Sequence, residues 1–194
     1  MSEWRLFEPG TTPECTTADW YAGRENAAHL EEGTHRPRLV RSAALVAQIA
    51  FSRRLTTLVD LGAGDGGLLS LLGPAITGWG YDLSPAAVQA AKDRGVDVRH
   101  GDVLTATLQW GQIAVATEML EHLVDPHAFV RTIAANCDAL VCSSPWQERP
   151  GFAYEFHTWA WDFTGYRALV EQAGFEVAHH EAVGPFQIIM AAKP

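Results

Sequence analysis

A glycine-rich run from Asp60 to Gly66 joins an apolar stretch to leucines that recur at helical spacing. Leu58 and Val59, just before this run, have the character of a buried strand end. Because glycine has no Cβ, the backbone here can turn sharply and come close to a ligand. Backbone N–H groups exposed at a strand-to-helix turn bind small polar ligands. The run therefore predicts a ligand-binding turn at the end of a strand.

Two further carboxylates follow the next predicted strands. Asp82 ends the second strand, and Asp102 comes directly after the third. Ligands of an open α/β sheet bind at the carboxyl ends of its strands, so both acids are expected beside Asp60. The three acids predict a binding site that spans three neighbouring strands.

The order D-x-G-x-G-x-G, then Y-D, then G-D-V resembles the class I S-adenosylmethionine (SAM)-dependent methyltransferases, over about residues 55–192. The resemblance implies that SAM is the cofactor and that Asp82 binds its ribose hydroxyls. It implies that Asp102 and the Val103 amide bind adenine, and that Asp60 binds the methionyl ammonium. The cofactor-binding residues implied in this way are Asp60, Gly62, Gly64, Asp82, Leu83, Asp102, Val103 and Thr117.

Two other classes of protein stay open. Gly62, Gly64 and Gly67 fit the G-x-G-x-x-G fingerprint of dinucleotide-dependent dehydrogenases, with Asp82 about 20 residues further on. In dehydrogenases of that fold the fingerprint normally opens the domain, and a second domain brings the substrate. In this chain about 54 residues precede the fingerprint. A regulatory or partner subunit that binds SAM without catalysis is the other alternative.

The run E-M-L-E-H at residues 118–122 follows the fourth predicted strand. On a helix, Glu118, Glu121 and His122 would stand at i, i+3 and i+4 and share one face. His157 follows the fifth predicted strand and would return to the same edge of the sheet. Two carboxylates and two imidazoles suit Mg²⁺, Mn²⁺ or Zn²⁺. Glu118, Glu121, His122 and His157 are therefore the predicted metal ligands.

The E-x-x-E-H run resembles two branches of the methyltransferases. One is the ubiquinone-biosynthesis O-methyltransferases, which carry a similar E-M-L-E-H-x-x-D-P run. The other is the small-RNA 3′-terminal 2′-O-methyltransferases, in which these residues and a later His hold a divalent cation. The chain departs from the second branch because its spacing to His157 is short and because it is acidic. A similar run also occurs in metal-free relatives, so His122, His157 and Glu118 are alternatively catalytic residues, with either imidazole as the base.

Aromatic residues crowd the segment after the fifth predicted strand. Such side chains form the wall of a pocket for a planar or apolar acceptor, stack on bases, or pack as core. They are Trp146, Phe152, Tyr154, Phe156, Trp159, Trp161, Phe163 and Tyr166. The candidates for a lid over the acceptor are Trp20, Tyr21, Arg24, His29, His35 and Arg36.

Strands and helices alternate along the chain, which indicates a doubly wound, mostly parallel sheet. Strands are expected at residues 56–61, 78–82, 96–100, 113–117, 139–143, 175–182 and 186–191, and helices at 37–54, 66–72, 85–94, 118–125, 126–136 and 164–173. The short link between the last two strands makes that pair antiparallel. This predicts a Rossmann-like α/β fold, for which the family resemblance implies seven strands and an antiparallel last strand. A single domain, residues 1–194, would hold an arm or lid (1–36), a leading helix (37–54) and the SAM-binding core (55–192).

The charge of the chain limits its partners. The 23 acidic and 14 basic residues give a net charge of −9, which disfavours broad binding to nucleic-acid phosphates. One stretch without acids holds Arg36, Arg38, Arg41, Arg53 and Arg54, either as a solvated helix face or as an anion-binding patch. A small-molecule acceptor is therefore expected, with an RNA end as the alternative.

Location also follows from composition. No apolar run approaches the length of a membrane span, and the first 20 residues lack a signal-peptide core. Three cysteines form no C-x-x-C pair and favour free thiols in a reducing compartment. We expect a cytoplasmic enzyme without membrane contact, and the sequence leaves its oligomeric state open.

Overall fold

Seven strands form the central sheet of the computed structural model, which describes residues 2–25 and 27–194. They are β2 (Thr57–Leu61), β3 (Thr77–Asp82), β4 (Val98–His100), β5 (Ile113–Thr117), β6 (Ala139–Pro145), β8 (Glu176–Val183) and β9 (Phe186–Ala192). Their order across the sheet is β4-β3-β2-β5-β6-β9-β8. All neighbours pair in parallel except β9, which runs antiparallel to both β6 and β8. The predicted fold, including its antiparallel last strand, is confirmed.

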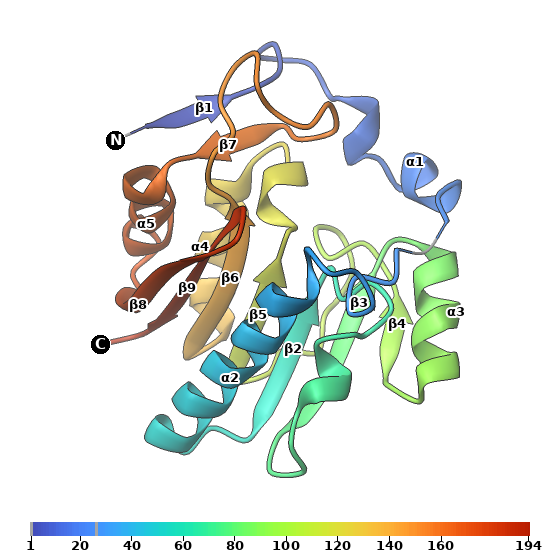
Figure 1. The fold of residues 1–194 in the computed structure, drawn as a ribbon, viewed down its shortest axis with the longest axis vertical. Coiled ribbons are helices and arrows are strands. Elements are labelled where there is room, and N and C mark those ends of the chain that lie inside the picture. The colour runs from blue at the N-terminus through green and yellow to red at the C-terminus, as the bar shows by residue number, and fades with distance from the viewer. Residues whose placement is uncertain (1, 26) are drawn as a thin grey trace.

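Helices cover both faces of this sheet (Figure 1). On one face α2 (Arg36–Arg53) and α3 (Pro85–Arg94) pack into one apolar cluster, and on the other α4 (Pro126–Asn136) and α5 (Phe163–Gln172) pack into a second. Every residue of β5 is buried, as expected for a parallel strand between two helical layers. Burial of a side chain such as Ile113 contributes roughly 1.5–3 kcal/mol.

Helix boundaries follow local chemistry where the sequence contains clear caps. The Ser84 side chain accepts a hydrogen bond from the Ala87 N–H, and Pro85 occupies the first helical position of α3. Gly95, at a φ of 80°, ends that helix in the left-handed region. The limits predicted for this helix match those of α3, and Asp125 caps α4 in the same way.

Two predicted helices are wrong. Residues 66–72 contain only a single 3₁₀ turn, Leu69–Leu71, because Gly66 at its start has a left-handed φ of 71° and Leu72 at its end is already extended. Residues 118–125 likewise contain only the 3₁₀ turn Leu120–His122, because Glu118 has a φ of 54°. The acids and the histidine of the E-x-x-E-H run therefore do not share a helical face.

A second, two-stranded sheet was not predicted. Here β1 (Glu3–Arg5) pairs antiparallel with β7 (Trp159–Trp161), so that Glu3 lies opposite Trp161. The chain then passes through a 3₁₀ turn, Glu14–Thr16, to α1 (Ala18–Ala22), which lies near the top of α3 in Figure 1. The role of residues 1–36 as a lid stays a prediction. Among the described residues, no helix has both the length and the apolar character needed to cross a membrane.

Candidate functional site

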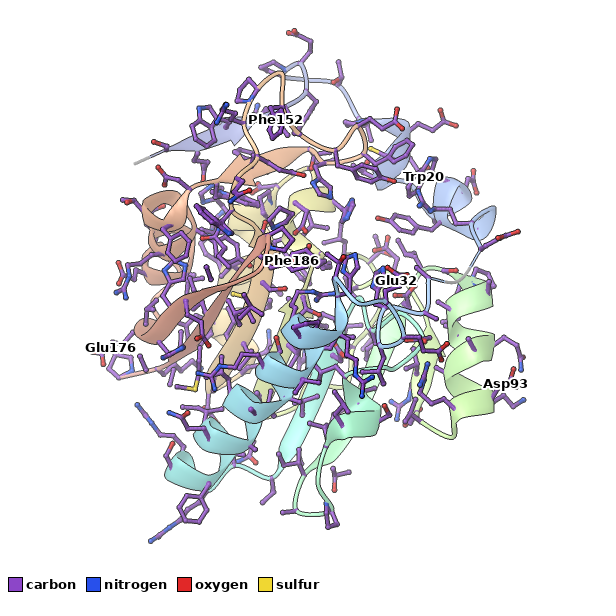
Figure 2. The ribbon with its side chains drawn as sticks, in the orientation of Figure 1. Trp20, Glu32, Asp93, Phe152, Glu176 and Phe186 are labelled. Atoms are coloured by element: carbon purple, nitrogen blue, oxygen red, sulfur yellow. The ribbon has the colours of Figure 1, made fainter. Side chains whose placement is uncertain are left out.

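A cavity of about 660 Å³ opens at the carboxyl ends of β2, β3 and β5. The residues that line it come from these strand ends, from the turn after β4, from residues 16–25 and 27–39, from the loop after β6 and from the start of β9. Figure 2 shows Trp20 and Phe152 above this region and Phe186 beside it. All of the predicted cofactor-binding residues lie on its wall: Asp60, Gly62, Gly64, Asp82, Leu83, Asp102, Val103 and Thr117. The topology therefore brings the three sequence motifs together.

The glycine-rich turn is fixed against the end of β3. Gly62 has a φ of 77°, and a Cβ at this position would lie 2.9 Å from Cγ of Met119. The N–H of Gly62 donates to the Tyr81 carbonyl at 2.9 Å, and the N–H of Gly64 donates to Asp82 Oδ2 at 2.8 Å. Glycine is required at position 62 both for the backbone conformation and for space.

The two later acids are held by backbone donors. Asp82 Oδ1 accepts from the Ser84 N–H at 2.8 Å, yet burial raises the pKa of this carboxyl above its usual range. Asp102 accepts from the Leu104 N–H at 2.9 Å and from the Thr105 hydroxyl at 3.1 Å. Both carboxylates keep lone pairs for a ligand, because each carboxylate oxygen can accept more than one hydrogen bond.

Asp60 is the most deeply buried of these acids, with 1% of its surface exposed. Its Oδ1 has no hydrogen-bond partner among the described residues. Burial, together with the negative charge of Asp82, raises the pKa of Asp60 to about 7, while Arg38 opposes this rise. A cationic ligand group in the cavity would offset the burial cost of this carboxylate.

Arg38 is the buried member of the predicted arginine patch. Its side chain is 1% exposed and lines the cavity, and its Nε has no partner among the described residues. The other guanidinium nitrogens donate to Ser143 Oγ and His35 Nδ1, both at 3.4 Å. Arg41 pairs instead with Glu181, and Arg36, Arg53 and Arg54 are exposed. Of the five arginines of the patch, Arg38 is the one that lines the cavity.

The predicted metal ligands lie near one another, with one exception. A ligand atom from each of Glu121, His122 and His157 lies within 4.8 Å of the other two. Glu118 is outside this group, because its Oε1 accepts from the Ser143 hydroxyl at 3.0 Å. Glu118, His122 and His157 line the cavity, whereas Glu121 is not among the residues that line it. The structure therefore brings three of the four predicted ligands into one cluster.

Burial controls the protonation of this cluster. Glu121 is fully buried, and neither of its carboxylate oxygens has a hydrogen-bond partner among the described residues. Burial and the neighbouring Glu118 raise the pKa of Glu121 well above its usual range. Burial, followed by the charge of His157, lowers the pKa of His122 to about 3. His122 is thus neutral near pH 7, and its Nδ1 donates to the Phe156 carbonyl at 3.1 Å, which leaves Nε2 with a lone pair.

The aromatic segment divides into core and cavity. Trp159, Trp161 and Tyr166 are buried in the main apolar cluster, so for them the core interpretation holds. Phe152 and Tyr154 are exposed and line the cavity. Two of the predicted lid residues, Trp20 and Arg24, meet this segment at Phe156. The Trp20 ring lies 5.0 Å from that of Phe156, and the Arg24 guanidinium lies 4.1 Å from the Trp20 ring.

Residues 33–180, most of the chain, match the family model described as a methyltransferase domain. The chain belongs to this methyltransferase family. The resemblance stated from the sequence, to class I SAM-dependent methyltransferases, and the prediction of an enzyme are both confirmed. The dehydrogenase alternative is thereby excluded.

Among curated proteins, a segment of the chain is similar to ubiquinone biosynthesis O-methyltransferase of Methylobacterium nodulans. The two are 36% identical over 90 residues, which cover 41% of this chain and about a third, 35%, of that protein. Among solved structures, magnesium protoporphyrin IX methyltransferase from Synechocystis with bound SAM has a TM-score of 0.69 at 16% identity, over 95% of this chain and 100% of that one. Human N-acetylserotonin methyltransferase in complex with SAM has a TM-score of 0.63 at 19% identity, over 79% of this chain and 51% of that one.

Proposed function

We propose that this methyltransferase transfers the methyl group of SAM to a hydroxyl oxygen of a small-molecule acceptor, with a divalent cation beside the acceptor. The observation that carries the proposal is Glu121, a fully buried carboxylate without a partner next to two imidazoles. The shared segment with an O-methyltransferase and the SAM bound in two structural neighbours support it.

The chemistry of the cavity wall supports a specific placement of the cofactor. Asp82 would accept from the ribose hydroxyls, while Asp102 and the Val103 amide would bind adenine. Asp60 would bind the methionyl ammonium, which neutralises its costly charge, and Arg38 would bind the methionyl carboxylate through its unpartnered Nε. An acid and a guanidinium side by side suit the two charged groups of an amino acid.

The acceptor would lie on the side of the histidines and of the aromatic loop. The donor set fits a divalent cation, since carboxylates and imidazoles are its ordinary ligands and the Glu121 carboxylate has no partner among the described residues. Glu121, His122 and His157 would hold it, and when bound it would lower the pKa of the acceptor hydroxyl. Tyr154 and Trp20 would pack on an apolar acceptor and exclude water. If no cation binds, Nε2 of either histidine would instead take the hydroxyl proton as a base.

A small acceptor is favoured over an RNA end by the net charge of −9 and by a cavity of about 660 Å³, a size typical of small-molecule sites. The three cysteines are free and buried, which supports the cytoplasm as the location.

Calorimetry tests the cofactor. SAM or its demethylated product should bind and NAD should not. Asp82→Ala should weaken binding by about 30- to 150-fold, the equivalent of about 2–3 kcal/mol. Asp97→Ala is the matched control, because the Asp97 side chain is exposed and forms an ion pair with Arg99 away from the cavity. Equal effects of the two variants would contradict the ribose assignment.

Chelation tests the cation. Purified protein is assayed with SAM on a panel of phenols, catechols and an RNA 3′ end, before and after chelator treatment and with Mg²⁺, Mn²⁺ or Zn²⁺ added back. We expect turnover on a hydroxylated small molecule that falls on chelation, while SAM binding persists. Full turnover after chelation, with no metal found by elemental analysis, would leave the cluster a metal-free acid/base role. Methylation of the RNA end alone would overturn the small-molecule assignment.

A further inference from the structure

His157 is held by a carboxylate that no sequence pattern indicated. Glu148 Oε2 lies 2.6 Å from Nδ1 of His157, and the side chains of these residues are 17% and 9% exposed. Both residues line the cavity. The pair is thus nearly shielded from water, so little solvent competes for the hydrogen bond between the two side chains.

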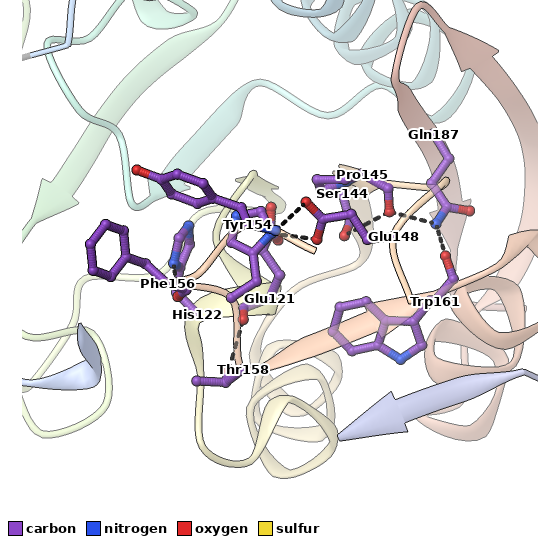
Figure 3. A network of polar contacts seen from close by, with 11 residues as sticks. Glu121, His122, Ser144, Pro145, Glu148, Tyr154, Phe156, Thr158, Trp161 and Gln187 are labelled. Carbon is purple, nitrogen blue, oxygen red and sulfur yellow. Dashed lines mark hydrogen bonds and ion pairs between the residues drawn. The ribbon is translucent and has the colours of Figure 1, made fainter. Parts of the chain in front are cut away.

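The other oxygen of Glu148 holds the backbone of the same loop. Glu148 Oε1 accepts from the Tyr154 N–H at 3.1 Å, and the His157 N–H in turn donates to the Tyr154 carbonyl at 3.0 Å. Figure 3 shows Glu148 between Pro145 and Tyr154, with dashed lines from its carboxylate. One carboxylate therefore fixes both the loop and the imidazole that the loop carries.

This contact determines which nitrogen of His157 is free. A carboxylate can only accept, so Nδ1 of His157 carries the proton and Nε2 presents a lone pair when the ring is neutral. His122 has the same arrangement, with its Nδ1 donating to the Phe156 carbonyl. The two rings meet edge to face, with centroids 4.8 Å apart. In both rings a hydrogen bond at Nδ1 fixes the orientation of the imidazole, and Nε2 is the nitrogen left for a ligand or a proton.

We propose that Glu148 is a positioning residue that holds His157 in its Nδ1-protonated tautomer and so keeps Nε2 available to the acceptor side of the cavity. The purpose assigned to that lone pair rests on the proposed methyl transfer to a hydroxyl group. The tautomer itself does not, because it follows from the hydrogen bonds of Glu148 alone. An outer partner of this kind typically changes activity by about 10- to 100-fold when it is removed.

Glu148→Gln separates orientation from folding. A glutamine keeps the size of the side chain and can still accept from the Tyr154 N–H, but its amide can also donate to Nδ1 and so favour the other tautomer. Glu155→Gln is the matched control, because Glu155 is exposed on the same loop and loses the same charge.

Imidazole ¹⁵N chemical shifts give the tautomer directly. They are measured by long-range ¹H–¹⁵N NMR at pH 7.5 on the protein loaded with S-adenosylhomocysteine, the demethylated product of SAM. We expect Nδ1–H for His157 in the original protein and in Glu155→Gln, and a rise of the Nε2–H form in Glu148→Gln. With a methylated catechol as product, kcat should fall by about 10- to 100-fold in Glu148→Gln, while the Kd of SAM stays unchanged.

The NMR and kinetic results each support or contradict the proposed role of Glu148. A His157 that carries its proton on Nε2 in the original protein would overturn the proposal. An unchanged tautomer or an unchanged kcat in Glu148→Gln would also overturn it. In that case the side chain would only support the loop through its hydrogen bond from the Tyr154 N–H, which glutamine retains. If no hydroxyl compound is methylated, the proposed function fails, and the tautomer result still decides whether Glu148 fixes the ring.

Discussion

At the scale of single residues, the cavity wall carries buried charges that destabilise the fold on their own. Asp60 is almost fully buried, and its Oδ1 accepts no hydrogen bond among the described residues. Arg38, equally buried, leaves Nε without a partner there. Such groups cost stability until a ligand satisfies them. The free protein is therefore less stable than its packing alone would allow.

Asp60→Asn is expected to stabilise the free protein at alkaline pH. An acid whose folded pKa is raised contributes stability that is present below its unfolded pKa and is lost as the pH rises through the folded value, here from about 4 to about 7. The cost above pH 7 is at most about 4 kcal/mol. Thermal melts should show a larger gain at pH 8 than at pH 4, and SAM binding should weaken. An equal gain at both pH values, or an equal effect of Asp97→Asn, would contradict this.

At the scale of elements, the turn after β5 stores backbone strain. Glu118 is one of two described residues other than glycine with a positive φ, and its N–H donates to the Ser143 carbonyl at 3.0 Å. This conformation breaks the helix that the E-x-x-E-H pattern predicted and turns the Glu118 side chain toward Ser143. Left-handed conformations of this kind cost about 1–2 kcal/mol and are common at functional sites.

The strain at Glu118 can be measured with a pair of variants. Glu118→Gly and Glu118→Ala both remove the carboxylate, but only glycine adopts a φ of 54° without a steric cost. The glycine variant should therefore be more stable than the alanine variant by about 1 kcal/mol in urea denaturation. Methyl transfer should fall to the same extent in both. Equal denaturation midpoints would show that the turn is unstrained.

At the scale of the whole molecule, β1 links the start of the chain to the segment that follows His157. The Leu6 N–H donates to the Thr158 carbonyl at 2.8 Å, and the Asp162 N–H donates to the Ser2 carbonyl at 3.1 Å. A Cβ on Gly165, in α5, would lie 2.3 Å from that same Ser2 carbonyl oxygen. The start of the chain and α5 thus fit together only because position 165 has no side chain.

Gly165→Ala should reverse the usual sign of such a change. Glycine to alanine inside a helix normally stabilises by about 0.5–1 kcal/mol. Here the new methyl group would displace the Ser2 carbonyl, so we expect a loss of about 1–3 kcal/mol and faster hydrogen exchange at the amides of Leu6 and Asp162. Gly73→Ala is the control, because a Cβ there meets no atom within 4 Å. A stabilised Gly165→Ala variant would refute the close fit.

How much of this could be predicted depended on the range of the interactions. Strands such as β5 and caps such as Ser84 are local signals, and the prediction found them. The turn at Glu118 depends on a hydrogen bond to β6, and the pairing of β1 with β7 joins residues far apart in the chain. Glu148 was missed because its role depends on a loop conformation that no periodicity encodes. Local patterns thus gave the scaffold, while the orientation of His157 required tertiary contacts.

The positions of β1 and of the end of β9 relative to the cavity have a practical consequence for handling the protein. β9 starts at Phe186 on the cavity wall and ends at Ala192, opposite the first residue of β6, so it carries the chain to the edge of the sheet away from the cavity. The first strand instead pairs with the segment next to His157 (Figure 1). A fluorophore or a surface tether placed on the side of the sheet where β9 ends therefore leaves the cavity undisturbed.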